Sequence, residues 1–211
     1  MTIVILGIDA LDPDIANPDD HPELTLSGYS SIETIDSSAG KPSTHELWPT
    51  IITGLPPEEH GLTLDDGMSW DNTVLNLTSS VADYFIPDGL QAQVGEWLLN
   101  NTEADTFRTP ATYYSENGIS TVFDGHDSKA IGVPNYVMNT DEEDREHVLR
   151  KDMGDLFERG EHESEDPVEF YEVCMEMSMV RIALTRRALR RREYELVFGY
   201  TSGLDLIGHA S

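Results

Sequence analysis

Cysteine and long apolar runs are scarce in this chain of 211 residues, and each scarcity excludes a class of protein. The single cysteine, Cys174, excludes an internal disulfide and is typical of a reducing compartment. No apolar run approaches the roughly 20 residues that a membrane-spanning helix needs, and no signal peptide precedes the first apolar segment. We therefore expect a cytoplasmic protein without a membrane partner.

Basic residues are also few. Lys and Arg together number 13 against 40 Asp and Glu, which gives a formal net charge of −27. Such a surface repels itself in dilute buffer, whereas molar salt shortens the Debye length to roughly 3 Å. The acidic residues are spread over the whole chain, which favours a halophilic cytosol over an acidic tail for a basic partner. The lack of a basic stripe argues against broad nucleic-acid binding.

Three apolar segments predict strands, and their alternation with helix patterns predicts an α/β fold with a mostly parallel sheet flanked by helices. Residues 2–8 (TIVILGI) form a β-branched run that suits a central strand buried on both faces. Residues 119–123, which precede Asp124, and residues 196–200 (LVFGY) predict two further strands. We expect one domain over residues 1–211.

Helix patterns lie between these segments. They cover residues 90–99, residues 110–116 after Pro110, and residues 168–192, the longest. Residues 139–167 are almost all polar and acidic, which predicts a surface insertion; a lid and a solvated loop are both open interpretations. In the longest helix, apolar side chains at a spacing of three to four residues predict a core-facing stripe: Tyr171, Met175, Met179, Ile182 and Leu189.

The stretch at residues 41–61 (KPSTHELWPTIITGLPPEEHG) carries the most chemistry. It predicts a short helix that is capped by Ser43 or Thr44 and stops at Gly54, then a turn through His60. A hydroxyl at a helix N-terminus lies where backbone N–H groups and the helix dipole favour a phosphate. Thr44 is therefore a candidate nucleophile or phosphate contact, although capping alone also explains a threonine there.

Candidate metal ligands follow two of the strands. Asp9 comes directly after the first, where ligand-binding groups of open α/β sheets lie, and a turn aspartate is an equally good interpretation. Asp205 and His209 follow the last strand, and their spacing places them on one helical face if that segment is helical. A carboxylate and an imidazole suit Zn²⁺ or Mn²⁺, but such a pair can also be unrelated to metal.

Three blocks in this order resemble the alkaline phosphatase superfamily, and within it the type I phosphodiesterase/nucleotide pyrophosphatase branch. They are GIDALD at residues 7–12, PSTHELWPTIITGLPPEEHGL at residues 42–62 and DLIGH at residues 205–209. The TG-x-x-P-x-x-HG spacing in the second block is the most specific part, and GVPNY at residues 132–136 also resembles a family segment. The resemblance covers nearly the whole chain.

The resemblance implies a phosphoester hydrolase with two divalent metal ions, most simply Zn²⁺ or Mn²⁺. Asp9 and Thr44 would bind one ion, and Asp205 and His209 would bind the other. Thr44 would attack the phosphorus of a small phosphoester substrate. A phosphatase or phosphomutase of the same superfamily and a non-catalytic, degenerate domain are the alternatives. A sulfatase is disfavoured, because the C/S-x-P-x-R nucleophile motif is absent.

The chain departs from the family pattern in three ways. The family completes its metal sites with a later DHG block and a further histidine, and neither follows His209. We therefore expect a fragment truncated before that block, inactive by itself, with weak metal binding and an exposed sheet edge that favours a homo-oligomer. Asp65 replaces an asparagine that contacts phosphate in nucleotide pyrophosphatases. His45 and Glu46 stand where relatives often carry small residues, and Glu46 would either repel anionic substrates or face solvent.

Overall fold

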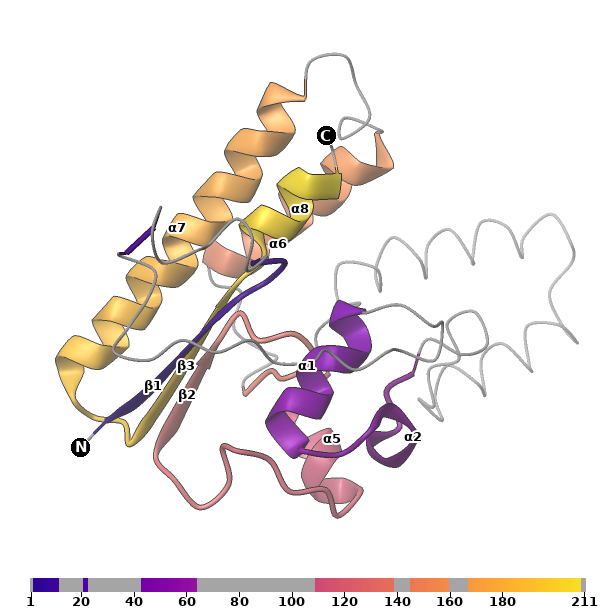
Figure 1. The fold of residues 1–211 in the computed structure, drawn as a ribbon. Helices are drawn as coiled ribbons and strands as arrows, with labels where there is room; N and C mark the ends of the chain where they lie inside the picture. Colours follow the sequence, from indigo (N-terminus) through magenta and orange to yellow (C-terminus); the bar gives the residue numbers. More distant parts are fainter. Residues whose placement is uncertain are drawn as a thin grey trace, which may run out of the picture. The chain divides into compact units, whose positions relative to one another are not determined.

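The computed structural model describes residues 2–11, 21–22, 43–63, 109–138, 145–159 and 167–209. Contacts divide the chain into two compact units, whose helices and strands are labelled in Figure 1. The first unit consists of residues 1–35, 123–133 and 142–211, and the second of residues 36–122 and 134–141. The fold is α/β, with a small parallel sheet and flanking helices in the first unit.

The sheet of the first unit has three parallel strands in the order β1-β3-β2. The central strand β3 (Leu196–Thr201) is buried along its whole length, as its apolar sequence predicts. Strands β1 (Ile3–Ile8) and β2 (Ser128–Ile131) pair with its two edges, and Ile3 and Ser128 are both in register with Leu196. The carboxyl ends of β1 and β3 therefore reach the same edge of the sheet.

Three helices complete this unit: α6 (Arg145–Glu158), α7 (Val168–Arg191) and α8 (Gly203–His209). The long helix α7 packs against β3 and β2, and α6 and α8 pack against α7 (Figure 1). One core cluster joins Leu156 of α6 to Phe170 and Cys174 of α7. The middle of the predicted insertion at residues 139–167 is thus a helix packed on the core, while its lid function stays a prediction.

The apolar stripe predicted for α7 is wrong at three of its positions. Met175 and Met179 are 58% and 64% exposed, and Ile182 is exposed as well. The buried side lies on another face of the helix and includes two polar residues, Arg181 and Thr185. Hydrophobic periodicity favours the wrong face because it discounts polar residues, which tolerate burial when they are hydrogen-bonded. The residues of the buried face are Phe170, Cys174, Met177, Arg181, Thr185 and Ala188.

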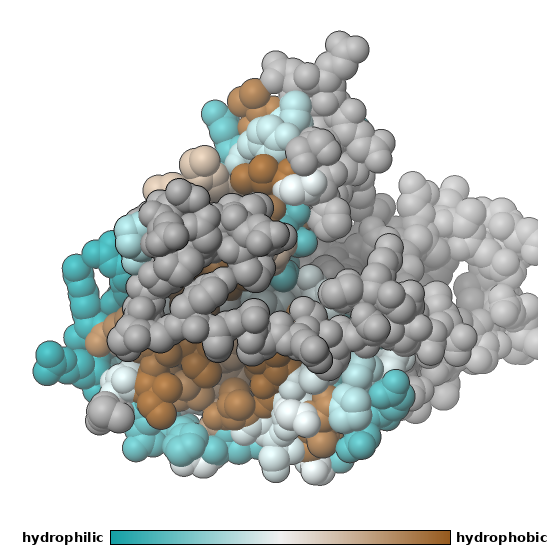
Figure 2. Space-filling model, viewed as in Figure 1, coloured by the Kyte–Doolittle hydropathy of each residue, from teal (hydrophilic) through white to brown (hydrophobic). Residues whose placement is uncertain are grey.

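Two strand predictions also need correction. β1 is an edge strand of the described sheet rather than a central one, and its residues from Ile3 to Leu6 are exposed. Apolar side chains gather at the surface in the region of the sheet (Figure 2). Residues 119–123 form no strand; the strand is β2, and Asp124 lies in the turn before it. Phe123 is buried by packing against Phe198 instead of by strand pairing, and apolar content cannot distinguish these two modes of burial.

The second unit contains the short helices α1 (Thr44–Thr53), α2 (Pro57–His60) and α5 (Ala111–Glu116). The predicted stop of α1 is confirmed, since Gly54 adopts the left-handed conformation and donates its N–H to the carbonyl of Thr50. The predicted helix after Pro110 is also confirmed.

Several predictions fall outside the described residues. They concern the helix at residues 90–99, most of the loop before residue 43, Asp65 and both ends of the insertion. Among the helices that the structure describes, none combines the length and the apolar character needed to cross a membrane.

Candidate functional site

Asp9 lies just past β1, at the sheet edge where its place in the sequence predicts it. Its backbone N–H donates to the carbonyl of Thr201 at 2.9 Å and so continues the pairing of β1 with β3. The carboxylate is nearly buried, with 9% exposure. Oδ2 accepts a hydrogen bond of 2.6 Å from the hydroxyl of Tyr200, and Oδ1 accepts one of 3.2 Å from the N–H of Ala10. Both oxygens are thus oriented by the protein.

Tyr200 is the residue that sequence reasoning missed at this edge. Its ring is 3% exposed on β3, and the guanidinium carbon of Arg181 lies 5.4 Å from the ring centroid. Burial, together with the carboxylate of Asp9 and more weakly that of Asp205, raises the pKa of Tyr200 well above its usual value. The phenol therefore stays protonated and donates to Asp9. A tyrosine in an apolar strand gives no signal of this role in a single sequence.

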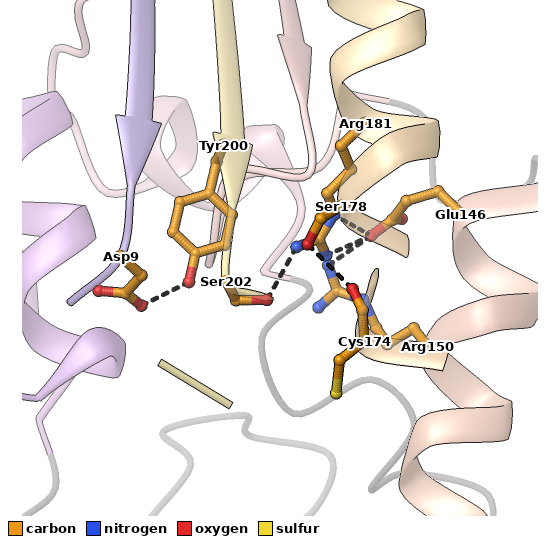
Figure 3. A network of polar contacts seen from close by, with 8 residues as sticks. All are labelled: Asp9, Glu146, Arg150, Cys174, Ser178, Arg181, Tyr200 and Ser202. Carbon is orange, nitrogen blue, oxygen red and sulfur yellow. Dashed lines mark hydrogen bonds and ion pairs between the residues drawn. The ribbon is translucent and has the colours of Figure 1, made fainter. Parts of the chain in front are cut away.

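Behind Tyr200, a buried ion-pair network connects α7 to α6 (Figure 3). Arg181 is 2% exposed, and its Nε donates to Oε1 of Glu146 at 3.0 Å, while its Nη1 donates to the hydroxyl of Ser202 at 3.2 Å. Arg150 donates to the same Glu146 oxygen at 3.0 Å. Burial by itself raises the pKa of Glu146, but Arg150 and Arg181 outweigh it and hold the pKa at about 2. Glu146 therefore stays ionised at neutral pH.

Asp205 lies in the first turn of α8, a few residues beyond β3. Its carboxylate is partly buried and lies close enough to Tyr200 to raise the pKa of that phenol. The helical state of α8 confirms that the backbone spacing puts Asp205 and His209 on one helical face. The side chain of His209 lies outside the description. Asp9 thus contacts Tyr200, while Asp205 lies in the helix that follows the strand of that tyrosine.

Thr44 belongs to the second unit and is the first residue of α1. The N-cap is Ser43, whose backbone is extended, so Thr44 is not the capping residue. Glu46, in the same first turn, is fully buried, which excludes the interpretation that it faces solvent. The structure therefore excludes Thr44 as the cap of α1, and its interpretation as a nucleophile stays a prediction.

The histidine of the TG-x-x-P-x-x-HG motif fastens α2 to α1. His60 is fully buried, and burial lowers its pKa against an opposing effect of Glu46, so the imidazole is neutral at pH 7. The N–H of Leu62 donates to its Nδ1 at 3.2 Å. The proton then resides on Nε2, which lies 3.1 Å from Oγ1 of Thr50 in the second turn of α1.

The other motif residues shape the backbone around this contact. The hydroxyl of Thr53 donates to the carbonyl of Pro49 at 2.7 Å and accepts the N–H of Leu55 at 3.1 Å, which closes the end of α1. Gly61 has a φ of 75°, and a Cβ there would lie 2.8 Å from the hydroxyl of Tyr113. Glycine is required for both reasons. This part of the motif is a structural support for the helix that begins at Thr44.

Asn135, in the GVPNY segment, holds the other end of α1. Its Nδ2 donates to the carbonyl of His45 at 2.9 Å and lies 3.0 Å from Nδ1 of the same residue. Its own amide oxygen accepts from the hydroxyl of Thr109, and its carbonyl accepts from Tyr114 at 2.6 Å. Asn135 is fully buried with a φ of 55°, a conformation that asparagine tolerates well. Only its place after Pro134 signals a special turn in the sequence.

The four predicted metal-binding residues are divided between the units: Asp9, Asp205 and His209 in the first, Thr44 in the second. Within the described ranges, no group of three or more His, Cys, Asp or Glu side chains is arranged to hold a metal ion. No family model, curated protein or solved structure matches the chain.

Proposed function

We propose that the chain is the catalytic domain, or part of one, of a metal-dependent phosphoester hydrolase with an alkaline-phosphatase-like fold. The observation that supports this most is the place of Asp9 at the carboxyl edge of a parallel sheet, with Asp205 in the helix that follows the central strand. Ligand sites of open α/β sheets lie at this edge. The reaction class, phosphoester hydrolysis, comes from the resemblance of the blocks at residues 7–12, 42–62 and 205–209 to the alkaline phosphatase superfamily.

The donor chemistry fits a hard or borderline divalent cation. Zn²⁺ and Mn²⁺ both accept the oxygen and imidazole ligands that these residues offer. Asp9 with Thr44, and Asp205 with His209, would hold two such ions. When bound, they lower the pKa of coordinated hydroxyls and neutralise charge on a phosphoryl group.

In the proposed reaction, Oγ of Thr44 forms a bond to phosphorus as the bond to the leaving oxygen breaks, and the hydroxyl proton leaves to solvent. Thr44 lies in the first turn of α1, and the backbone N–H groups of a helix N-terminus favour a phosphoryl group. His60 and Asn135 hold the two ends of α1 by named hydrogen bonds, so the nucleophile is carried on a rigid element. Water would then release the phosphoryl group from threonine.

The substrate is a small phosphoester, and a diester is favoured by the branch that the blocks resemble. A phosphatase or phosphomutase of the same architecture would act on monoesters instead. The charge of −27 favours a salt-rich cytoplasm, the exposed edge strand β1 favours a homo-oligomer, and residues 139–167 remain the proposed lid.

Covalent labelling tests this proposal without requiring turnover. The chain is incubated in molar KCl with bis(2,4-dinitrophenyl) phosphate, with Mn²⁺ or with EDTA, and analysed by peptide mass spectrometry. We expect one phosphoryl adduct on Thr44 that depends on Mn²⁺ and is absent from Thr44→Ala. Ser115→Ala, which removes an exposed hydroxyl from α5 of the same unit, should keep the adduct. The lack of any adduct, or an adduct that forms in EDTA, would contradict the proposal.

A further inference from the structure

Helix α7 carries a row of exposed apolar side chains, which we call the exposed stripe. Spacings of seven, four and three residues place them on one face of the helix, away from the face that is buried in the first unit. Exposed apolar residues that gather in one patch, unlike single ones, mark an interaction site. The stripe consists of Val168, Met175, Met179 and Ile182, which are 42% to 64% exposed.

The charged side chains of α7 are segregated along the helix. Glu169 and Glu172 are exposed near its start, whereas exposed arginines occupy its last two turns: Arg186, Arg187, Arg190 and Arg191. The helix dipole favours cations in the last turn only, and Arg186 and Arg187 lie one turn earlier. In a chain with only 13 Lys and Arg, α7 is thus acidic at one end, apolar in the middle and basic at the other end.

A helix with this pattern is complementary to a reversed copy of itself. We infer that α7 pairs with α7 of a second copy of this chain, antiparallel about a twofold axis at Met179, the middle of the helix. Met179 then faces its own counterpart, and Met175 faces the small, exposed Ala183, because both lie four residues from the axis. Glu172 faces Arg186 of the second copy, because both lie seven residues from it. The twofold axis forms each of these contacts twice.

The apolar centre and the charged ends have different functions in this pairing. Burial of the exposed stripe supplies affinity, and methionine side chains adapt readily to such a contact. The charges select the orientation, since a parallel pair would place like charges opposite each other. One pair of helices forms a small interface, so we expect a dimer that dissociates on dilution. The inference is independent of the proposed reaction and of the exposed edge of β1.

The first test follows dimer formation of the full chain in molar KCl, by analytical ultracentrifugation over a series of dilutions. Molar salt screens the repulsion between two chains of charge −27. We expect a concentration-dependent dimer in the wild type, weakened at least roughly 10-fold in Met179→Glu, since the new charge would be buried without a partner. Val148→Glu is the matched control, because it adds the same charge to an exposed apolar position of α6, and it should dimerise like the wild type. Urea unfolding of dilute, dissociated protein should be unchanged in Met179→Glu, since the stripe is exposed in a single chain.

Charge reversal tests the orientation. Glu172→Arg and Arg186→Glu should each weaken the dimer, because each variant places two pairs of like charges face to face. An equal mixture of the two variants, or the double variant, should restore it. Arg159→Glu, an exposed reversal on α6, should have no effect.

Three results would overturn the inference. One is a wild-type chain that stays monomeric at every concentration, and another is a dimer that survives Met179→Glu or is weakened equally by Val148→Glu. The third is failure of the mixture of Glu172→Arg and Arg186→Glu to dimerise although circular dichroism shows both variants folded. None of these results bears on the proposed phosphoester hydrolase.

Discussion

The Nε2 atom of His60 lies 3.1 Å from the hydroxyl of Thr50, so the last residue of α2 is fastened to the second turn of α1. Both partners belong to the motif-bearing stretch, and neither is a predicted metal ligand. The contact explains why the most specific spacing in the sequence ends on a histidine. Its function is to hold the helix that starts at Thr44.

Replacement of His60 should therefore destabilise the second unit. His60→Ala removes a fully buried ring and leaves the N–H of Leu62 without its acceptor. We expect a loss of roughly 2–4 kcal/mol in the free energy of unfolding, from the cavity and the lost hydrogen bonds. Urea unfolding in molar KCl measures it. His126→Ala, on an exposed side chain, is the matched control and should change the free energy by less than about 0.5 kcal/mol.

The same histidine should make stability depend on pH. Its folded pKa is lowered by burial, so below the usual value of 6.5 the unfolded chain takes up a proton that the folded chain does not. Stability is then fully present above pH 6.5 and falls as the pH is lowered toward 5. Glu146 contributes no slope in this window, because its pKa of about 2 keeps it ionised. Unfolding free energies at pH 8 and pH 5 should differ less in His60→Gln than in the wild type; equal differences would rule out a buried neutral His60.

Stability should also rise with salt. A net charge of −27 makes the folded chain repel itself, and molar KCl screens that repulsion. Thermal melts in dilute buffer and in molar KCl should show a clearly higher midpoint in KCl. Equal midpoints would defeat the halophilic interpretation.

The two apolar faces of α7 should respond differently to truncation. Met177 is 1% exposed and Met179 is 64% exposed, two residues apart on one helix. Met177→Ala should cost roughly 2–5 kcal/mol through the cavity it creates, whereas Met179→Ala should change stability by less than about 0.5 kcal/mol. A large cost at Met179 instead would show that this face is covered in solution.

Element types followed from the sequence where local chemistry decided them. Gly54 ends α1, Pro110 precedes α5, and the apolar run of β3 is a buried strand. The packing of the strands could not be predicted in this way. β1 and β3 have similar apolar sequences, yet among the strands that the structure describes only β3 has neighbours on both edges. Which side of α7 is buried depended on Arg181, whose burial requires partners far away in the chain.

The residues of the candidate site also fall into those that the sequence predicts and those that it does not. The positions of Asp9 and Asp205 could be predicted, because residues that follow parallel strands lie at the same edge of the sheet. Tyr200 and Asn135 could not, because each acts through a hydrogen bond to a residue 191 or 90 positions away. Single-sequence patterns carry no information about such pairs.

The most direct test of the central claim is a Mn²⁺ titration of Asp9→Asn and Asp205→Asn beside the wild type, followed by electron paramagnetic resonance in molar KCl. The control is Asp155→Asn, which removes an exposed acid from α6 and corrects for binding to the acidic surface. Two weak sites are expected in the wild type and in the control, and each of the other variants should lose one site. Wild-type occupancy in both Asp9→Asn and Asp205→Asn would contradict the account.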